Sequence, residues 1–201
     1  MNPHLSASGQ CKHEAEVMNL PFYTIGHATR TLEEFVAVLQ AAEVQLVVDI
    51  RTIPRSRTNP QFNAETLSES LALYGIGYEW LSELGGLRRK SKDIAPDVNG
   101  FWENPSFHNY ADYALSDSFR KGLDKLVRLG RKQRCVVMCA EAVWWRCHRR
   151  IVADYLLARG ETVFHLMGDN RIEEAHLTPG ASVSSSDIVH YPPGADSANP
   201  H

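Results

Sequence analysis

Short apolar runs alternate with amphipathic helical stretches along most of this chain, and this alternation constrains the fold more than any other feature. The apolar runs are residues 22–25, 45–50, 78–81, 135–139 and 161–166. Helical patterns stand between and after them, at residues 31–39, 64–73, 109–115, 119–130 and 146–159. Alternation of strands and helices is typical of a parallel sheet covered by helices on both faces. We therefore expect a single three-layer α/β domain with a mostly parallel sheet of about five strands.

The two ends of the chain differ from its middle. Residues 1–19 are polar and show no period, which predicts a disordered N-terminal tail. Residues 171–201 are rich in Ser, Pro, Gly and Asp and contain few apolar anchors, which predicts a mostly irregular C-terminal tail. The α/β domain is then expected at residues 20–170, a length that suits one domain.

The composition is that of an ordinary globular protein, with 43% apolar and 22% charged residues. No apolar run approaches the ~18 residues of a membrane span, and the first twenty residues lack the apolar core of a signal peptide. We expect a cytoplasmic protein that does not interact with membranes. In that compartment the four cysteines, Cys11, Cys135, Cys139 and Cys147, are expected to be reduced, so a special one would bind metal or react.

Positive charge is concentrated in three short segments. Ten of the 21 lysine and arginine residues lie at 51–57, 88–92 and 146–150, and these segments contain no acid. The net charge of −3 gives no reason to expect wholesale binding of nucleic acid. If the three segments meet in space, their electric field can instead favour binding of one anion, such as a phosphate, a nucleotide or a nucleic acid. The alternative is three solvated turns that never meet.

Several polar residues follow the carboxyl ends of the predicted strands. Parallel sheets bind ligands beyond these ends, so we expect the residues there to share one pocket. The predicted pocket contains His27, Asp49, Arg51, Ser56, Gly85, Cys139 and Glu141. Residues 88–103 have no period of their own, and we expect them to form a lid or wall over this pocket.

Four residues are candidates for catalysis. Cys139 ends an apolar strand shortly before a helix, a position that stabilises a thiolate nucleophile, although a small buried cysteine is the alternative. Glu141 is a candidate acid or base, or only a helix cap, and His27 is a second candidate for proton transfer. Asp49 would orient His27 or Arg51, or simply form an ion pair that stabilises its loop.

A second group is predicted to bind the substrate. Arginine side chains and close-lying glycine backbone suit an anionic ligand. The candidates are Arg51, Arg55, Ser56, Gly85, Gly86 and Arg149. Trp102 would stack on a nucleic-acid base if it is exposed, and belongs to the core if it is not.

A metal site is a further alternative. Cys139, Cys147 and His148, together with His27, offer the thiol and imidazole ligands that zinc prefers. Their spacing matches no zinc finger or ribbon, and two neighbouring side chains on a helix point about 100° apart. His148 also aligns with a core face of the predicted helix at 146–159, so a buried histidine is the competing interpretation.

Four motifs together are similar to those of one known family, the domain of unknown function 488 family. The motifs are Thr24-Ile25-Gly26-His27, Val48-Asp49-Ile50-Arg51 with Pro54 and Ser56, Glu83-Leu84-Gly85-Gly86, and Cys139-Ala140-Glu141 followed by Cys147-His148-Arg149. The resemblance spans about residues 22–168. It implies an α/β fold and a site at these motifs, and it implies no reaction.

Three functions therefore stay open. The first is an enzyme, a cysteine-dependent hydrolase or transferase acting on a phosphate-bearing or nucleotide-like molecule. A phosphatase loop would place an arginine where this chain has Trp145. The second is a module that binds or modifies nucleic acid, and the third is a zinc-binding domain. The sequence identifies no cofactor and no oligomeric state.

Overall fold

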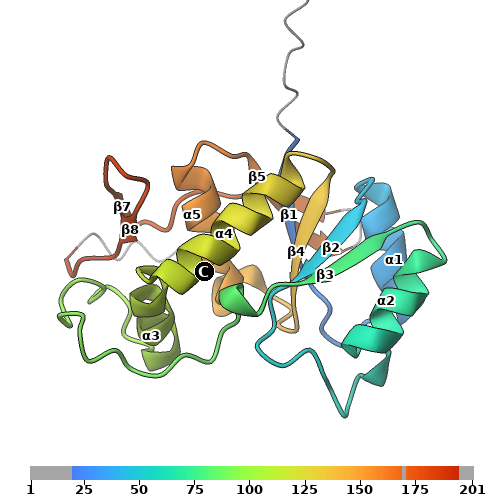
Figure 1. Cartoon of the computed structure of the whole chain (residues 1–201), viewed down its shortest axis with the longest axis horizontal. Helices are drawn as coiled ribbons and strands as arrows, with labels where there is room; N and C mark the ends of the chain where they lie inside the picture. Colours follow the sequence, from blue (N-terminus) through green and yellow to red (C-terminus); the bar gives the residue numbers. More distant parts are fainter. Residues whose placement is uncertain (1–19, 169–170, 195–201) are drawn as a thin grey trace, which may run out of the picture.

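A six-stranded sheet divides the molecule into three layers (Figure 1). The computed structural model describes residues 20–168 and 171–194. The strands are β1 (Phe22–Gly26), β2 (Leu46–Asp49), β3 (Gly77–Trp80), β4 (Cys135–Cys139), β5 (Val163–Gly168) and β6 (Arg171–Glu174). Their order is β3-β2-β4-β1-β5-β6; the first five run parallel and β6 is antiparallel to β5. The predicted α/β class with a mostly parallel sheet is confirmed.

Within the described residues, five α-helices cover the two faces of the sheet (Figure 1). One face carries α1 (Leu32–Ala41) and α2 (Ala64–Ala72), which pack on it through residues such as Phe35 and Leu67. The other face carries α3 (Pro105–Ala114), α4 (Asp117–Gly130) and α5 (Arg149–Ala158). Three short 3₁₀ helices complete this part of the chain: η1 (Pro60–Phe62), η2 (Ser82–Leu84) and η3 (Trp144–Arg146).

The direction of winding reverses between β1 and β4, which are neighbours in the centre of the sheet. From β1 the chain passes through α1 on one face to β2, and from β4 it passes through α5 on the other face to β5. The two crossovers leave in opposite directions. Such a reversal opens a crevice at the carboxyl ends of the two strands, where doubly wound sheets bind ligands. The fold therefore indicates that a ligand site would lie among the residues after Gly26 and Cys139.

The chain after β5 is better anchored than its composition predicted. It forms β6 and a small hairpin of β7 (Ser182–Val183) and β8 (Val189–His190). Val189 and Tyr191 are fully buried, and the Tyr191 hydroxyl donates to Asp154 Oδ2 at 2.7 Å. Val189 and Tyr191 thus anchor this segment to the core, although their polar sequence neighbours predicted an irregular tail. The expected tail at 1–19 and the last residues, 195–201, lie outside the described part of the chain.

None of the helices in the described part of the chain is both long enough and apolar enough to cross a membrane.

A buried histidine in β5 makes the fold sensitive to acid. His165 is 2% exposed, stacks on Trp144 at 4.4 Å and lies 2.7 Å from Thr24 Oγ1. Burial, with Arg149 and Arg150 nearby, lowers the pKa of His165 from 6.5 to about 3. The neutral ring therefore stabilises the fold fully above pH 6.5, and this contribution is lost as the pH falls towards 3.

Replacing His165 by glutamine, which does not titrate, is expected to flatten this dependence. Between pH 6 and pH 4 the wild-type protein should lose about 2 kcal/mol more of its free energy of unfolding than the variant does. Urea unfolding at a series of pH values measures this difference. The control is His176→Gln, at an exposed position. Parallel profiles for wild type and His165→Gln would contradict the assignment.

Candidate functional site

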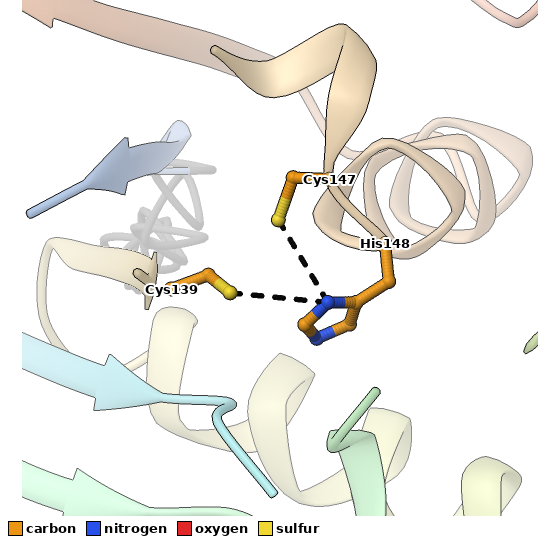
Figure 2. Close-up of side chains that lie close together, drawn as sticks. All are labelled: Cys139, Cys147 and His148. Carbon is orange, nitrogen blue, oxygen red and sulfur yellow. Dashed lines mark hydrogen bonds between the residues drawn. The ribbon is translucent and has the colours of Figure 1, made fainter. Parts of the chain in front are cut away.

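Two thiols and an imidazole meet at the carboxyl edge of the sheet (Figure 2). Cys139 is the last residue of β4, and Cys147 and His148 lie directly before α5. The Nδ1 atom of His148 is 3.8 Å from Cys139 Sγ and 3.7 Å from Cys147 Sγ. All three ligand atoms lie within 4.8 Å of one another. We call these three residues the Cys-Cys-His cluster; it lies beyond the carboxyl end of β4, where His148 reaches the backbone that follows β2.

The local backbone explains why Cys147 and His148 can face the same point. The helix predicted to start at residue 146 begins only at Arg149, and the short η3 precedes it. Cys147 is extended, with φ −124° and ψ 144°, and His148 is the N-cap residue. The angle of about 100° between neighbours on a helix therefore does not apply. The prediction that His148 lies on a core face of that helix is wrong for this reason.

The His148 ring is held from several sides. Its Nε2 atom lies 3.1 Å from the carbonyl oxygen of Ile50, which can only accept, so Nε2 carries the proton. The Nδ1 lone pair is left facing the two sulfur atoms. Tyr110 packs edge-on against the ring at 4.9 Å, and a Cβ atom on Gly86 would lie 2.9 Å from Nδ1. Gly86, predicted to bind substrate, is thus the backbone that lies against this ring.

Arg149 is buried beside the cluster without a carboxylate partner. It is 1% exposed, and it forms no ion pair with any acid in residues 20–168 or 171–194. Its guanidinium donates to the carbonyl oxygens of Glu141 at 2.6 Å and Ala142 at 2.9 Å. Its Nε–H has no hydrogen-bond partner among the described residues. Arg149 therefore fixes the loop between β4 and α5 and adds an unbalanced positive charge there.

The two thiols of the cluster differ in acidity. Hydrogen bonding to Cys147 and burial raise the pKa of Cys139 to about 12. The pKa of Cys147 is lowered to about 7, because the Cys139 hydrogen bond and Arg149 together outweigh its burial. Cys139 and Cys147 are 8% and 3% exposed. These properties disfavour the predicted role of Cys139 as a nucleophile, and Cys147 is the sulfur that ionises first.

The other strand-end residues form a separate group on the opposite face of the sheet. Arg51 binds Asp49 through Nε at 2.9 Å and Nη2 at 2.5 Å, and Nη2 also donates to the Phe62 carbonyl at 2.7 Å. His27 stacks on Phe62 at 4.3 Å, with Nε2 3.3 Å from Arg51 Nη1. Tyr78 donates to Asp49 Oδ2 at 2.6 Å. These residues satisfy one another and form a structural network.

The ionisation state of His27 agrees with a structural role. Its Nδ1 atom lies 3.0 Å from the Ala28 carbonyl oxygen, so the lone pair on Nε2 is occupied by Arg51. Burial lowers the pKa of His27 to about 4. A histidine that is neutral and bonded at both nitrogens is poorly suited to the predicted proton transfer.

The remaining predicted residues are dispersed around the edge. Arg55 is exposed and lies 3.8 Å from exposed Glu65, and Ser56 accepts from the Asn59 amide at 3.0 Å. Gly85 packs on Thr52, where a Cβ atom would come within 2.8 Å of Oγ1. The Glu141 side chain is exposed on the loop that Arg149 holds.

Residues 88–103 are tied to the fold at both ends. Arg88 donates to the Gly85 carbonyl at 2.8 Å, and the buried Asn99 donates to Asp112 Oδ1 in α3 at 2.9 Å. Trp102 is 8% exposed and stacks on Phe107 at 4.8 Å. It belongs to the core, so it is not available to stack on a base.

Two parts of the site could not be predicted from the sequence. The Ile50 carbonyl and the Tyr110 ring both fix His148, yet neither carries a signal in the sequence. Each is brought to the ring by tertiary packing of β2 and α3, which no local pattern shows.

A family model described as domain of unknown function DUF488 matches residues 31–156. This span covers more than half of the chain. The chain belongs to the DUF488 family. The matched part of this DUF488 protein includes the whole Cys-Cys-His cluster, Arg149 and the Asp49–Arg51 ion pair, whereas His27 lies before it. Comparisons with curated proteins and with solved structures found no match.

Proposed function

We propose that this protein is a zinc-dependent hydrolase whose metal is held by the Cys-Cys-His cluster and whose substrate is an anion. The convergence of the three ligand atoms is the observation that carries this proposal. Tetrahedral zinc with usual bond lengths holds a sulfur and a nitrogen ligand about 3.6 Å apart. The observed distances of 3.7 and 3.8 Å are close to this value. A zinc ion would thus fit among the ligands with little movement.

The orientation of His148 supports the same proposal. Metal-binding histidines usually donate their second ring N–H to a carbonyl or a carboxylate, which fixes the ring and its tautomer. In His148 the Ile50 carbonyl has this role, and Nδ1 faces the thiols with its lone pair. Three electron-rich atoms that face one point need a positive centre between them, which is a proton or a cation.

The ligand set favours a reactive site over a purely structural one. Within residues 20–168 and 171–194, the group that could hold an ion has three members, and no fourth His, Cys, Asp or Glu joins it. Zinc sites with three protein ligands keep a position for water or substrate, whereas structural sites have four. Two sulfurs and one imidazole select zinc over magnesium or calcium, which prefer oxygen.

The charge of the site favours an anion at the fourth position. Two thiolates balance a divalent ion, and buried Arg149 then leaves one positive charge without a carboxylate partner. Burying an unbalanced charge is costly, so a hydroxide or a substrate anion is the favoured fourth ligand. The proposal therefore keeps the anionic substrate predicted from the sequence. Arg149, predicted to bind that substrate, lies beside the metal ligands.

The protein groups have distinct roles in this proposal. A zinc ion held by Cys139, Cys147 and His148 would supply a hydroxide at neutral pH, because zinc lowers the pKa of a bound water to about 7. Cys139 serves as a ligand in place of its predicted role as nucleophile. Glu141, exposed on the loop between β4 and α5, is the candidate for moving a proton between this edge and solvent.

Cobalt titration of the full reduced chain tests the metal site. We expect one equivalent of Co²⁺ to produce thiolate-to-cobalt charge transfer and tetrahedral visible bands, and Zn²⁺ to displace it. Cys139→Ser, Cys147→Ser and His148→Gln should each weaken binding by at least about tenfold, because each removes one of three ligands. Azide or phosphate should shift the visible bands by entering the fourth position.

The matched control is Cys135→Ser, at the other end of β4. Cys135 is buried and its thiol donates to the Gln133 carbonyl at 3.3 Å, away from the cluster. This variant should bind cobalt like the wild-type protein. Absence of charge transfer, or bands that persist in all three ligand variants, would contradict the proposal.

A further inference from the structure

Exposed basic residues without acidic partners lie in loops at the carboxyl edge of the sheet, the edge that also holds the proposed metal site. Of the ten basic residues in the three acid-free segments, four donate side-chain hydrogen bonds to other groups of the protein: Arg51, Arg88, Arg149 and Arg150. Five others are exposed and form no ion pair with the described acids: Arg57, Arg89, Lys90, Lys92 and Arg146. We call these five the basic rim. They lie in the loops after β2, β3 and β4.

At the amino ends of the strands, by contrast, several basic residues are neutralised. Arg131 pairs with Glu161 at 2.9 Å, and Arg159 pairs with Asp124 at 2.7 Å. Arg134 pairs with Glu43. These three basic residues of the amino edge are thus paired with carboxylates, unlike the five of the basic rim.

The loops of the basic rim are joined to one another. The Thr52 hydroxyl donates to the Gly86 carbonyl at 2.5 Å, which links the loop after β2 to the loop after η2. The Trp80 indole donates to the Arg51 carbonyl at 2.9 Å and is 44% exposed. A partly exposed aromatic side chain thus lies beside Arg51, at the start of the first basic segment.

The width of the basic rim indicates a ligand larger than one phosphate. Strands β3, β2 and β4 are neighbours in the sheet, and adjacent strands are about 4.8 Å apart. Loops that follow three neighbouring strands therefore spread their charge over about 10 Å. Several positive charges in a row beside an exposed aromatic ring are typical of surfaces that bind single-stranded nucleic acid.

We propose that the anionic substrate is a single-stranded nucleic acid, whose phosphates contact the basic rim and one of whose bases stacks on Trp80. This inference rests on the proposed function, because it names the substrate of that site. Hydrolysis would form a bond from the water oxygen to phosphorus and break one phosphorus–oxygen ester bond. The released alcohol oxygen takes the proton. Trp80 here has the stacking role that the sequence offered to Trp102.

Fluorescence anisotropy with labelled DNA and RNA 12-mers tests the substrate. The full chain should bind at low salt, with or without zinc, because the rim does not depend on the metal. Each phosphate contact contributes about −0.7 to the slope of log K against log salt. Replacing Arg89 and Lys90 together by glutamine should therefore make the slope shallower by about 1.4. Trp80→Leu should weaken binding about tenfold and leave the slope unchanged.

The matched control replaces Arg128 and Lys132 by glutamine. Both are exposed and lie near the amino edge, and the variant has the same net charge as the rim variant. It should bind like the wild-type protein. No oligonucleotide binding at low salt, an equal loss in both double variants, or binding of pyrophosphate in place of the oligonucleotide would overturn the inference. Cobalt binding is measured separately, so failure of the metal site and failure of the substrate are distinguishable.

Discussion

Replacing Arg149 by methionine is expected to destabilise the fold by about 3 kcal/mol and to weaken zinc binding by about 10- to 100-fold. Methionine fills much of the volume but cannot donate to the Glu141 and Ala142 carbonyls, which lie 2.6 and 2.9 Å from the guanidinium. The loop that carries Cys147 and His148 into the cluster is then free to move. Urea unfolding and competition with a zinc chelator measure the two effects.

Arg146→Met is the control for this prediction. Arg146 lies in the same segment, and its replacement by methionine removes the same charge. Its side chain, however, is exposed. Its free energy of unfolding should change by less than about 0.5 kcal/mol. The response of cobalt bands to anions should be lost in Arg149→Met and retained in Arg146→Met. If the two variants behave alike, Arg149 does not position the site.

The second large effect is expected at Gly26, the last residue of β1. A Cβ atom there would lie 1.8 Å from the Glu141 carbonyl oxygen, an overlap with backbone that cannot be relieved by a rotamer change. The oxygen is also held by Arg149 at 2.6 Å. Gly26→Ala should therefore destabilise the fold by at least about 3 kcal/mol and displace the loop between β4 and α5.

Gly160→Ala provides the comparison. Gly160 has φ +76° with open space around it, so alanine there pays only backbone strain of about 1 kcal/mol. Because Gly26 and Arg149 act on the same carbonyl, the double variant should lose less stability than the sum of the single losses. Additive losses would show that the two residues hold the loop independently.

The sequence predicted the fold well because the strands are signalled by their own composition. All five residues of β4 and all four of β2 are buried; β4 is a continuous apolar run, and β2 is one as far as its last residue, Asp49. Strand β6 was missed because Arg171–Glu174 is a charged edge strand with exposed side chains. The start of α5 was missed by three residues because the 3₁₀ turn at 144–146 contains tryptophans that read as a helical core stripe.

The candidate site was predicted only in part, because sequence order does not show which face of the sheet a side chain occupies. The strand-end rule gave Cys139 and Asp49 correctly as edge residues, but they lie in different cores. The arginines illustrate the same point. Arg51, Arg57, Arg89 and Arg149 all lie in the acid-free basic segments of the sequence. Arg51 and Arg149 are nevertheless buried and hydrogen-bonded within the protein, whereas Arg57 and Arg89 are exposed.

X-ray absorption at the zinc edge tests most directly whether the Cys-Cys-His cluster binds a metal. The measurement uses the zinc-loaded chain with Cys11→Ser, since Cys11 lies outside the described residues. We expect two sulfur ligands at about 2.3 Å, with one imidazole nitrogen and one further light atom at about 2.0 Å. Cys147→Ser should leave one sulfur. A spectrum with no sulfur shell, or one that Cys147→Ser does not change, would contradict the metal site.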